Sequence, residues 1–207
     1  DILCKISNKQ YLIISFIEAP LLAFILGYFT KYVDGDKYIF SKNENLPSYL
    51  FMSVVVALFI GLTIAAEEII KDKKIRKRES FLNLSYFSYI NSKLVVLFFI
   101  SAIQTFTFVL LGNLILGIKG MNLSYWLVLF TASCFSNVLG LLISSGFNSV
   151  VTIYILIPFI LVPQLLFSGV IVKFEKLHKA IASDKYVSVL GDVMISRWAY
   201  EALAVNQ

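Results

Sequence analysis

Charged residues are scarce in this chain. They make up 15% of its 207 residues, whereas a soluble domain of ordinary composition carries about 25%. Hydrophobic residues make up 58%, and they occur in uninterrupted runs that are far longer than a buried core requires. We therefore expect an integral membrane protein rather than a soluble domain.

Residues that build catalytic or metal sites are also rare. The chain has one histidine, His178, and two cysteines, Cys4 and Cys134, that are far apart in the sequence. One histidine cannot form a metal cluster, and so distant a pair of cysteines predicts neither a disulfide nor a metal site. There is no GxxxxGK(S/T) phosphate-binding loop, so we expect no ATP hydrolysis by this chain alone. We predict no catalytic, cofactor-binding or metal-binding residues in it.

Five segments are long and apolar enough to cross a membrane. A helix needs about 20 apolar residues, at ~1.5 Å rise each, to cross ~30 Å of hydrocarbon. The short alternating segments of a transmembrane barrel do not occur, so the spans should be helices. The expected fold is an all-α polytopic bundle with spans at 11–30, 48–66, 94–116, 125–145 and 150–172.

The distribution of basic residues predicts how these spans are oriented. The stretch KDKKIRKRES, residues 71–80, holds six basic and two acidic residues between the second and third spans. Because cytoplasmic loops are enriched in lysine and arginine, this loop and residue 1 should be cytoplasmic. The tail 173–207 should then be extracytoplasmic, with one or two short helices. Because the first residue is Asp1 rather than methionine, we expect a segment of a longer polypeptide, with either an odd number of spans or a later span.

Three predicted spans carry small residues at every fourth position. Lipid gives no hydrophobic drive for helix association, so small residues that allow close backbone approach favour packing. These stripes either pack within one bundle or meet a second protomer. The stripes are Ala19, Ala23 and Gly27; Ala57, Gly61 and Ala65; and Ala132, Ser136, Gly140 and Ser144.

A few polar residues and prolines interrupt the apolar runs. Glu18 is the one acid well inside such a run, and it either faces the bundle at membrane depth or lies near the inner surface. We expect interhelical hydrogen bonds from the amides of Gln104, Asn113 and Asn137 rather than ligand contacts. Pro158 and Pro163 predict a kinked fifth span, because proline removes a backbone donor.

The residues that follow the basic block resemble a known motif. Arg78-Glu79, then Ser85, Tyr89 and Lys93, are spaced as in the membrane domains of ABC type-2 exporters, particularly the G subfamily of white-pigment and multidrug exporter-like half-transporters. Leu84 stands where that family usually has tyrosine. The mixed charge and aromatic side chains of residues 78–93 also suit a short helix that lies against a soluble partner.

Two later stretches resemble the same family. LFSGVIV, residues 166–172, is similar to its Ser-Gly motif at the outer end of the fifth span. ISRWAYEALAVNQ, residues 195–207, is similar to the segment that precedes its sixth span. The resemblance implies a six-span half-transporter domain that dimerises and is driven by two ATP-binding domains.

The resemblance also implies roles for particular residues. The loop between the second and third spans would couple the membrane domain to the ATP-binding domain, through Arg78, Glu79, Ser85, Tyr89 and Lys93. The fifth span, with Pro158, would line the path, and Val170 and Ile171 would narrow it at its outer end. ATP and magnesium would bind to the partner domain and not to this chain.

The implied partners follow from the same resemblance. They are an ATP-binding cassette domain, fused or separate, a second membrane domain in a homodimer or heterodimer, and membrane lipid, whereas no nucleic acid is expected. The apolar path favours an amphipathic or lipidic substrate, and the expected location is the plasma membrane or a bacterial inner membrane.

Three other classes of protein are alternatives to an exporter. A channel or secondary carrier usually has several charged groups at membrane depth, where this chain has Glu18. A membrane-embedded enzyme needs a catalytic constellation, which one histidine in the tail does not supply. A membrane scaffold without transport activity fits the sequence as well, and nucleotide-dependent transport would separate it from an exporter.

Overall fold

A computed structural model describes residues 9–32, 43–78, 85–171 and 189–205, and no strand occurs within these residues. The first two described elements are long apolar helices, and the other described elements are helices as well. The helices are α2 (Lys9–Thr30), α3 (Leu46–Ala66), α4 (Glu68–Arg78), α5 (Tyr86–Leu116), α6 (Asn122–Gly146), α7 (Val150–Leu166), α8 (Val189–Val193) and α9 (Ile195–Val205).

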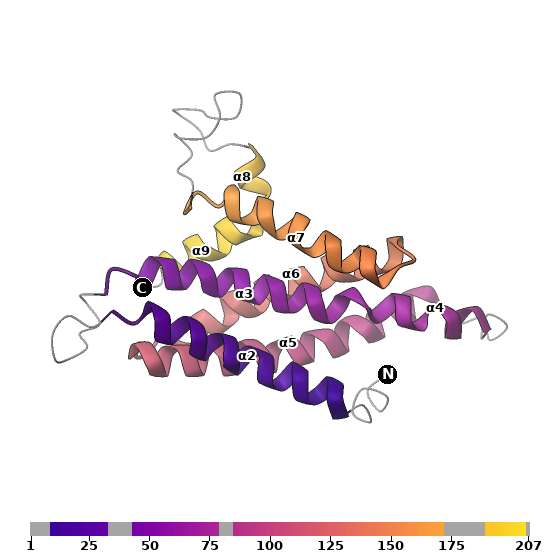
Figure 1. Cartoon of the computed structure of the whole chain (residues 1–207), viewed down its shortest axis with the longest axis horizontal. Coiled ribbons are helices and arrows are strands. Elements are labelled where there is room, and N and C mark those ends of the chain that lie inside the picture. Colours follow the sequence, from indigo (N-terminus) through magenta and orange to yellow (C-terminus); the bar gives the residue numbers. More distant parts are fainter. Residues whose placement is uncertain (1–8, 33–42, 79–84, 172–188, 206–207) are drawn as a thin grey trace.

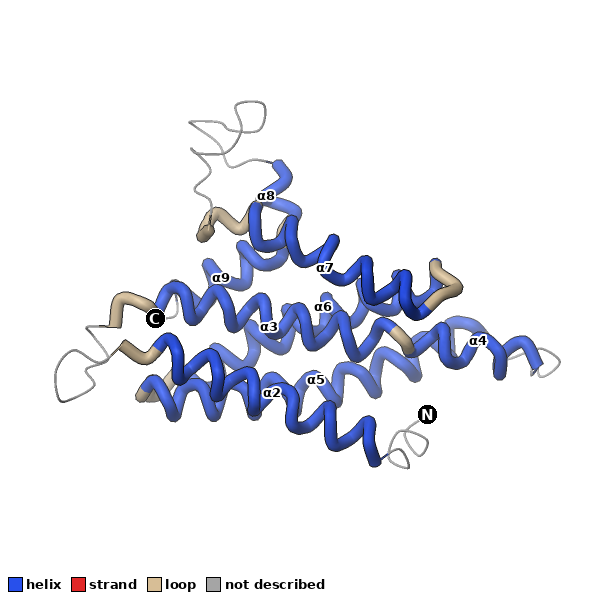
Figure 2. The backbone as a smooth tube through the Cα atoms, viewed as in Figure 1, coloured by secondary structure: helices blue, strands red, loops and turns tan. Residues whose placement is uncertain are grey.

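The long helices form one bundle in which successive helices run in opposite directions (Figure 1). Helix α3 lies at the centre of the bundle and contacts α2, α6, α7 and α9, and its contact with α6 is the most extensive of any pair. Helix α2 packs mainly against α5. Helix α4 continues in the direction of α3 and extends beyond the end of the bundle, where α2 also begins (Figures 1 and 2).

Four helical segments within the described residues are long and apolar enough to cross a membrane. They are α2, the continuous segment formed by α3 and α4, α5, and α6. The fifth apolar helix, α7, has 17 residues, which at ~1.5 Å per residue corresponds to roughly 26 Å. It ends at Leu166, six residues before the predicted end of the fifth span, and residue 172 lies outside the described residues. Phe167 is its C-cap, and the backbone turns two residues later at Gly169, whose φ of 79° is left-handed and favours glycine.

The first turns of α5 differ from the sequence expectation. Residues 86–93 do not form a separate short helix against a partner, since they are continuous with the 31-residue helix α5. The separate polar helix is α4, which precedes them in the chain. The predicted boundary at residue 94 was wrong as a helix boundary, because the polar residues before it end the apolar run but do not end the helix.

The small-residue stripes of α3 and α6 face each other inside the bundle. A Cβ atom on Gly61 would lie 2.6 Å from the carbonyl oxygen of Ser133, and one on Gly140 would lie 2.7 Å from the Cβ of Ala65. The stripe of α2 is also internal, because Ala19 is fully buried and a Cβ on Gly27 would lie 3.2 Å from Ile115 of α5. All three stripes therefore serve packing within one bundle.

Amide side chains connect the neighbouring helices. Gln104 Nε2 donates to the carbonyl oxygen of Ser15 at 2.6 Å, which joins α5 to α2. Asn137 Nδ2 donates to Ser101 Oγ at 2.8 Å and joins α6 to α5. Asn113 Nδ2 donates to Asn122 Oδ1 at 2.7 Å, which joins the same two helices near their connecting turn. The structure thus places all three amides in interhelical hydrogen bonds.

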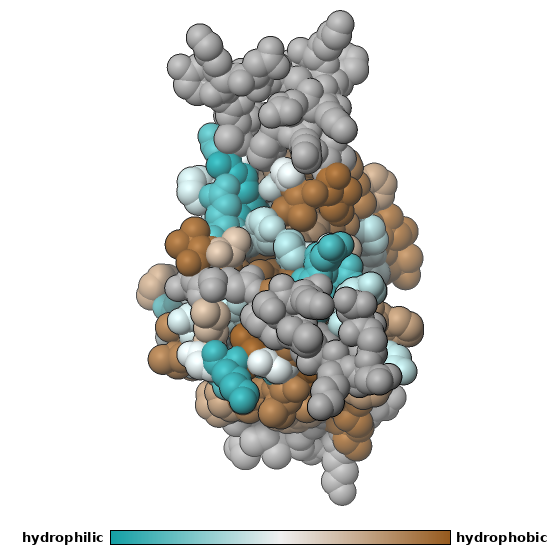
Figure 3. All heavy atoms as spheres, turned by 90° about the vertical axis from the view of Figure 1, so that its left-hand side faces the viewer, coloured by the Kyte–Doolittle hydropathy of each residue, from teal (hydrophilic) through white to brown (hydrophobic). Residues whose placement is uncertain are grey.

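The last two helices fold back onto the end of the bundle away from α4. Helix α9 packs against α3 and α6, and Ser196 Oγ donates to the carbonyl oxygen of Gln164 in α7 at 2.6 Å. Burial by itself would lower the pKa of Arg197, but hydrogen bonds to Asp192 and Glu201 raise it above its usual value. Figure 3 faces this end of the bundle, where hydrophilic side chains lie among hydrophobic ones. Residues 173–188 of the predicted tail lie outside the described residues.

The close approach of α3 and α6 gives a test of the bundle. Gly61→Ala should lower the free energy of unfolding in detergent by about 1–3 kcal/mol, because its Cβ would meet a backbone carbonyl that cannot rotate away. Gly146→Ala is the matched control, since a Cβ there meets nothing within 4 Å, and it should be neutral or stabilising. Equal stability of the two variants would contradict the α3–α6 packing.

Candidate functional site

The junction between α3 and α4 is the most polar part of the bundle. Helix α3 ends at Ala66, Glu67 lies at the break, and α4 begins at Glu68. Ser144 Oγ of α6 accepts hydrogen bonds from the backbone N–H groups of Ile69, at 3.1 Å, and Ile70, at 3.2 Å. The first turn of α4 is thereby held by a side chain of another helix, in the manner of a helix cap.

A buried lysine joins α4 to α5. Lys93 Nζ lies 2.7 Å from Asp72 Oδ2 and 3.4 Å from Glu68 Oε2. Lys93 and Glu68 are both buried, with 4% and 8% of their surface exposed. Charges in an apolar environment are costly unless they are paired and hydrogen-bonded, so the three groups depend on one another. The cluster fixes the angle at which α4 leaves the bundle.

Aromatic residues extend this contact along both helices. Tyr89 Oη donates to Asp72 Oδ2 at 3.0 Å, and the guanidinium carbon of Arg76 lies 4.6 Å from the centre of the Tyr89 ring. The same guanidinium lies 5.0 Å from the centre of the Tyr86 ring. Cation–π contacts of this kind stabilise by about 0.5–1 kcal/mol at exposed sites. We call Glu68, Asp72, Arg76, Tyr86, Tyr89 and Lys93 the α4–α5 cluster.

The structure brings together two of the five predicted coupling residues, Tyr89 and Lys93. Ser85 occupies the N-cap position of α5, but its side chain makes no capping hydrogen bond. Arg78 is the exposed last residue of α4, and Glu79 lies outside the described residues.

Sequence reasoning missed the acidic and basic partners on α4. Glu68, Asp72 and Arg76 are four residues apart, so they lie on one face of a helix and can meet a second helix together. This spacing was a signal in the sequence, but the basic block obscured it because six of its residues are lysine or arginine.

A cleft of about 260 Å³ lies beside the junction. Glu18 of α2 lines it and is half-buried, so this carboxyl group faces a space between helices and not the centre of the core. The cleft is lined by residues of α2, α3, α4 and α7 and the residue between α3 and α4, including Ser15, Glu18, Thr63, Glu67, Glu68, Lys71 and Tyr154.

The predicted path residues lie apart from this junction. Pro158 is exposed on the outer face of α7, inside one continuous helix that also contains Pro163. Val170 and Ile171 follow the turn after α7, and Ile171 is 53% exposed. Ser168 Oγ accepts a hydrogen bond from the Val170 N–H at 3.4 Å within that turn. The structure therefore does not gather these three residues into one cluster.

Among the described residues, no group of three or more histidine, cysteine, aspartate or glutamate side chains could hold a metal ion. The polar residues of the junction are instead arranged for contacts between helices. An assembly of ion pairs, capping and stacking can fix the position of α4, since its members hold α4, α5 and α6 together.

A family model described as "ABC-2 type transporter" matches residues 1–207, which is the whole sequence. No curated protein matches the chain.

The ion pairs of the α4–α5 cluster predict that replacing the buried Lys93 lowers stability more than replacing an exposed lysine. Lys93→Met should lower the free energy of unfolding by about 3 kcal/mol, because it leaves buried carboxylates without their cation. The exposed Lys119 supplies the control, and Lys119→Met should change stability by less than about 0.5 kcal/mol. Chemical denaturation in detergent measures both. Adding Asp72→Asn to Lys93→Met should cost less than the sum of the single changes, and simple additivity would argue against the ion pair.

Proposed function

The chain belongs to the ABC-2 type transporter family, and we propose that it is the transmembrane domain of an ATP-driven exporter of the G-subfamily type. It is an integral membrane protein and the transport component of an ABC transporter, not itself the catalytic one. ABC-2 membrane domains generally partner with ATP-binding cassette proteins. The proposal adds the direction of transport, the coupling element and the dimer.

The observation that carries the proposal is the attachment of α4 to α5. Helix α4 extends beyond the bundle and bears exposed lysine and arginine side chains, while its opposite face is tied to α5 by Lys93 and Asp72 (Figure 1). An exposed basic surface on a firmly held helix suits contact with an acidic surface of an ATP-binding domain. We place this end of the bundle in the cytoplasm, since the basic residues gather there.

A displacement of α4 would reach several spans at once. The α4–α5 cluster connects it to α5, and Ser144 connects its first turn to α6. Closure of two ATP-binding domains around ATP and magnesium would move α4 as a rigid body together with these spans. Alternating access then requires two packings of the bundle that differ by a few kcal/mol.

The exposed face of α7 supports a path at an interface between two membrane domains. Its apolar side chains are open on the surface of the chain, with Val151 68% exposed and Phe159 71% exposed. We propose that α7 and α3 line the path with their counterparts in a second membrane domain, identical or related. Val170 and Ile171 would narrow its outer end. So apolar a lining favours an amphipathic or lipidic substrate.

A scaffold without transport activity is the second candidate, since contacts between helices would serve it as well. Reconstitution of the chain with its ATP-binding domain in vesicles separates the two candidates. ATP-dependent movement of a fluorescent amphiphile across the membrane supports the exporter. Binding of the ATP-binding domain with no ATP-dependent movement of any amphiphile tested supports the scaffold.

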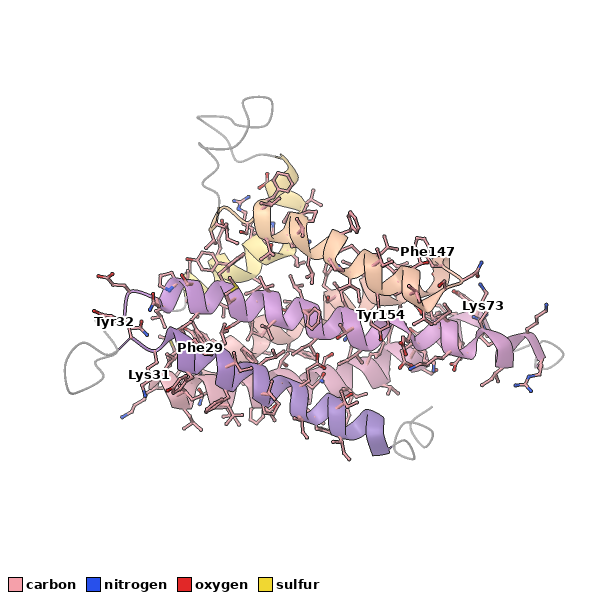
Figure 4. The ribbon with its side chains drawn as sticks, viewed as in Figure 1. Phe29, Lys31, Tyr32, Lys73, Phe147 and Tyr154 are labelled. Atoms are coloured by element: carbon pink, nitrogen blue, oxygen red, sulfur yellow. The ribbon has the colours of Figure 1, made fainter. Side chains whose placement is uncertain are left out.

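The coupling role predicts a charge-dependent association. Changing Lys73, Lys77 and Arg78 together to glutamate should weaken binding of the ATP-binding domain by roughly tenfold or more, about 1.4 kcal/mol, at low salt. The loss should shrink at high ionic strength because exposed charges are screened. Lys31→Glu with Lys119→Glu is the control, since Lys31 lies at the opposite end of the bundle from Lys73 (Figure 4). Equal binding by both variants would remove α4 as the docking surface.

A further inference from the structure

Glu67 lies at the break between α3 and α4 and uses its two carboxylate oxygens for two different helices. Oε2 forms an ion pair with Lys71 of α4. Oε1 accepts a hydrogen bond of 2.7 Å from Tyr154 Oη of α7. Figure 4 shows Tyr154 on α7 where this helix passes the α3–α4 junction. One side chain thus connects the proposed coupling helix with the proposed path helix.

The rest of the attachment of α7 is apolar at its inner end and polar at its outer end. Ile153 and Ile157, both buried, pack against Leu62 and Ala66 of α3, and Ile70 of α4 packs against the same cluster. At the outer end, Gln164 Oε1 accepts a hydrogen bond from the Ser196 N–H at 3.1 Å. Apolar contacts are non-directional, so they hold α7 against α3 without fixing the position of any one atom. The hydrogen bond of Tyr154 has a direction, and it anchors the inner end of α7.

A second contact leads from α4 to the same end of α7. Lys73 donates a hydrogen bond to Asn148 Oδ1 in the turn that precedes α7. Lys73, the turn and Tyr154 are all exposed, and both bonds involve a charged group, so the Tyr154 bond differs in that it reaches a residue within α7 rather than the turn before it. The Tyr154–Glu67 bond borders a cleft of about 260 Å³, and the space in that cleft leaves room for the inner end of α7 to move.

We propose that Tyr154 is a positioning residue that, through Glu67, makes the inner end of α7 follow the movement of α4. This inference rests on the proposed function and extends it, because the α4–α5 cluster and Ser144 reach α5 and α6 but not α7. A hydrogen bond from a phenol to a carboxylate is charge-assisted and roughly twice as strong as a neutral one. It therefore adds a directed link to the apolar contacts between α7 and the rest of the bundle.

The test measures a distance between α4 and α7 in the complete transporter with its ATP-binding domain, in lipid. Cys4→Ser and Cys134→Ala remove the two thiols of the 207-residue chain, and any cysteine in the rest of the transporter is replaced by serine as well. Cysteines at the exposed positions Ile75 and Val151 then carry spin labels. Without nucleotide, Tyr154→Phe should broaden the distribution of distances between the labels, because α7 has lost its directed bond. A distribution as narrow as that of the parent would overturn the link, whatever the transporter does with ATP.

The second measurement adds ATP and reads the Ile75 label and the Val151 label separately, each against a reference label at the exposed position Lys119, because the distance between Ile75 and Val151 stays constant when α4 and α7 move together. We expect the inner end of α7 in the parent to move with α4, and we expect Tyr154→Phe to lose most of that concerted movement while α4 still responds to ATP. Glu67→Gln keeps an acceptor for Tyr154, so it should retain more of the concerted movement than Tyr154→Phe does. Tyr200→Phe, on α9, is the matched control and should retain all of the concerted movement. Full concerted movement in Tyr154→Phe would overturn the link alone. No response to ATP in the parent would overturn the proposed function, and with it the transmission that depends on it.

Discussion

The contact between α3 and α6 is the constraint on which the rest of the structure depends. Lipid offers no hydrophobic drive for helix association, so the two helices must approach until backbone atoms touch. Gly61 and Gly140 make this approach possible, since a Cβ atom at either position would meet an atom of the partner helix within 3 Å. The approach also brings Ser144, the last member of the α6 stripe, to the first turn of α4. The packing of the spans therefore determines where the polar helix begins.

The α4–α5 cluster continues this packing into a region where the apolar stripes have ended. Small residues allow close contact inside the membrane, whereas Lys93 with Glu68 and Asp72 supplies directed contacts at its edge. An ion pair of this kind adds little net stability compared with an apolar contact, but breaking one half of it is costly. Its effect is thus to specify one position for α4 relative to α5.

The sequence predicted the apolar spans, the stripes and the interhelical amides because each depends on local spacing and on lipid as solvent. It did not predict that Tyr86 begins a helix continuous with the third span, because the change from polar to apolar residues marks the membrane boundary and not the helix boundary. Tyr89 and Lys93 were singled out by resemblance, but their partners on α4 were not. Pairing across two helices depends on the angle between them, which the packing of Gly61 and Gly140 sets and local spacing does not reveal.

Helix α7 stands apart from the other apolar helices in how it is attached. Helices α2, α3, α5 and α6 are joined by small-residue contacts and by hydrogen bonds within the core, such as Gln104 to Ser15. Helix α7 has no such stripe; it has apolar contact with α3 and hydrogen bonds toward its two ends. Ile153 and Ile157 are buried against α3, so apolar packing and directed bonds together hold α7 in place. The position of the small residues therefore separates four closely packed helices from α7, which is attached by larger apolar side chains and by hydrogen bonds toward its ends.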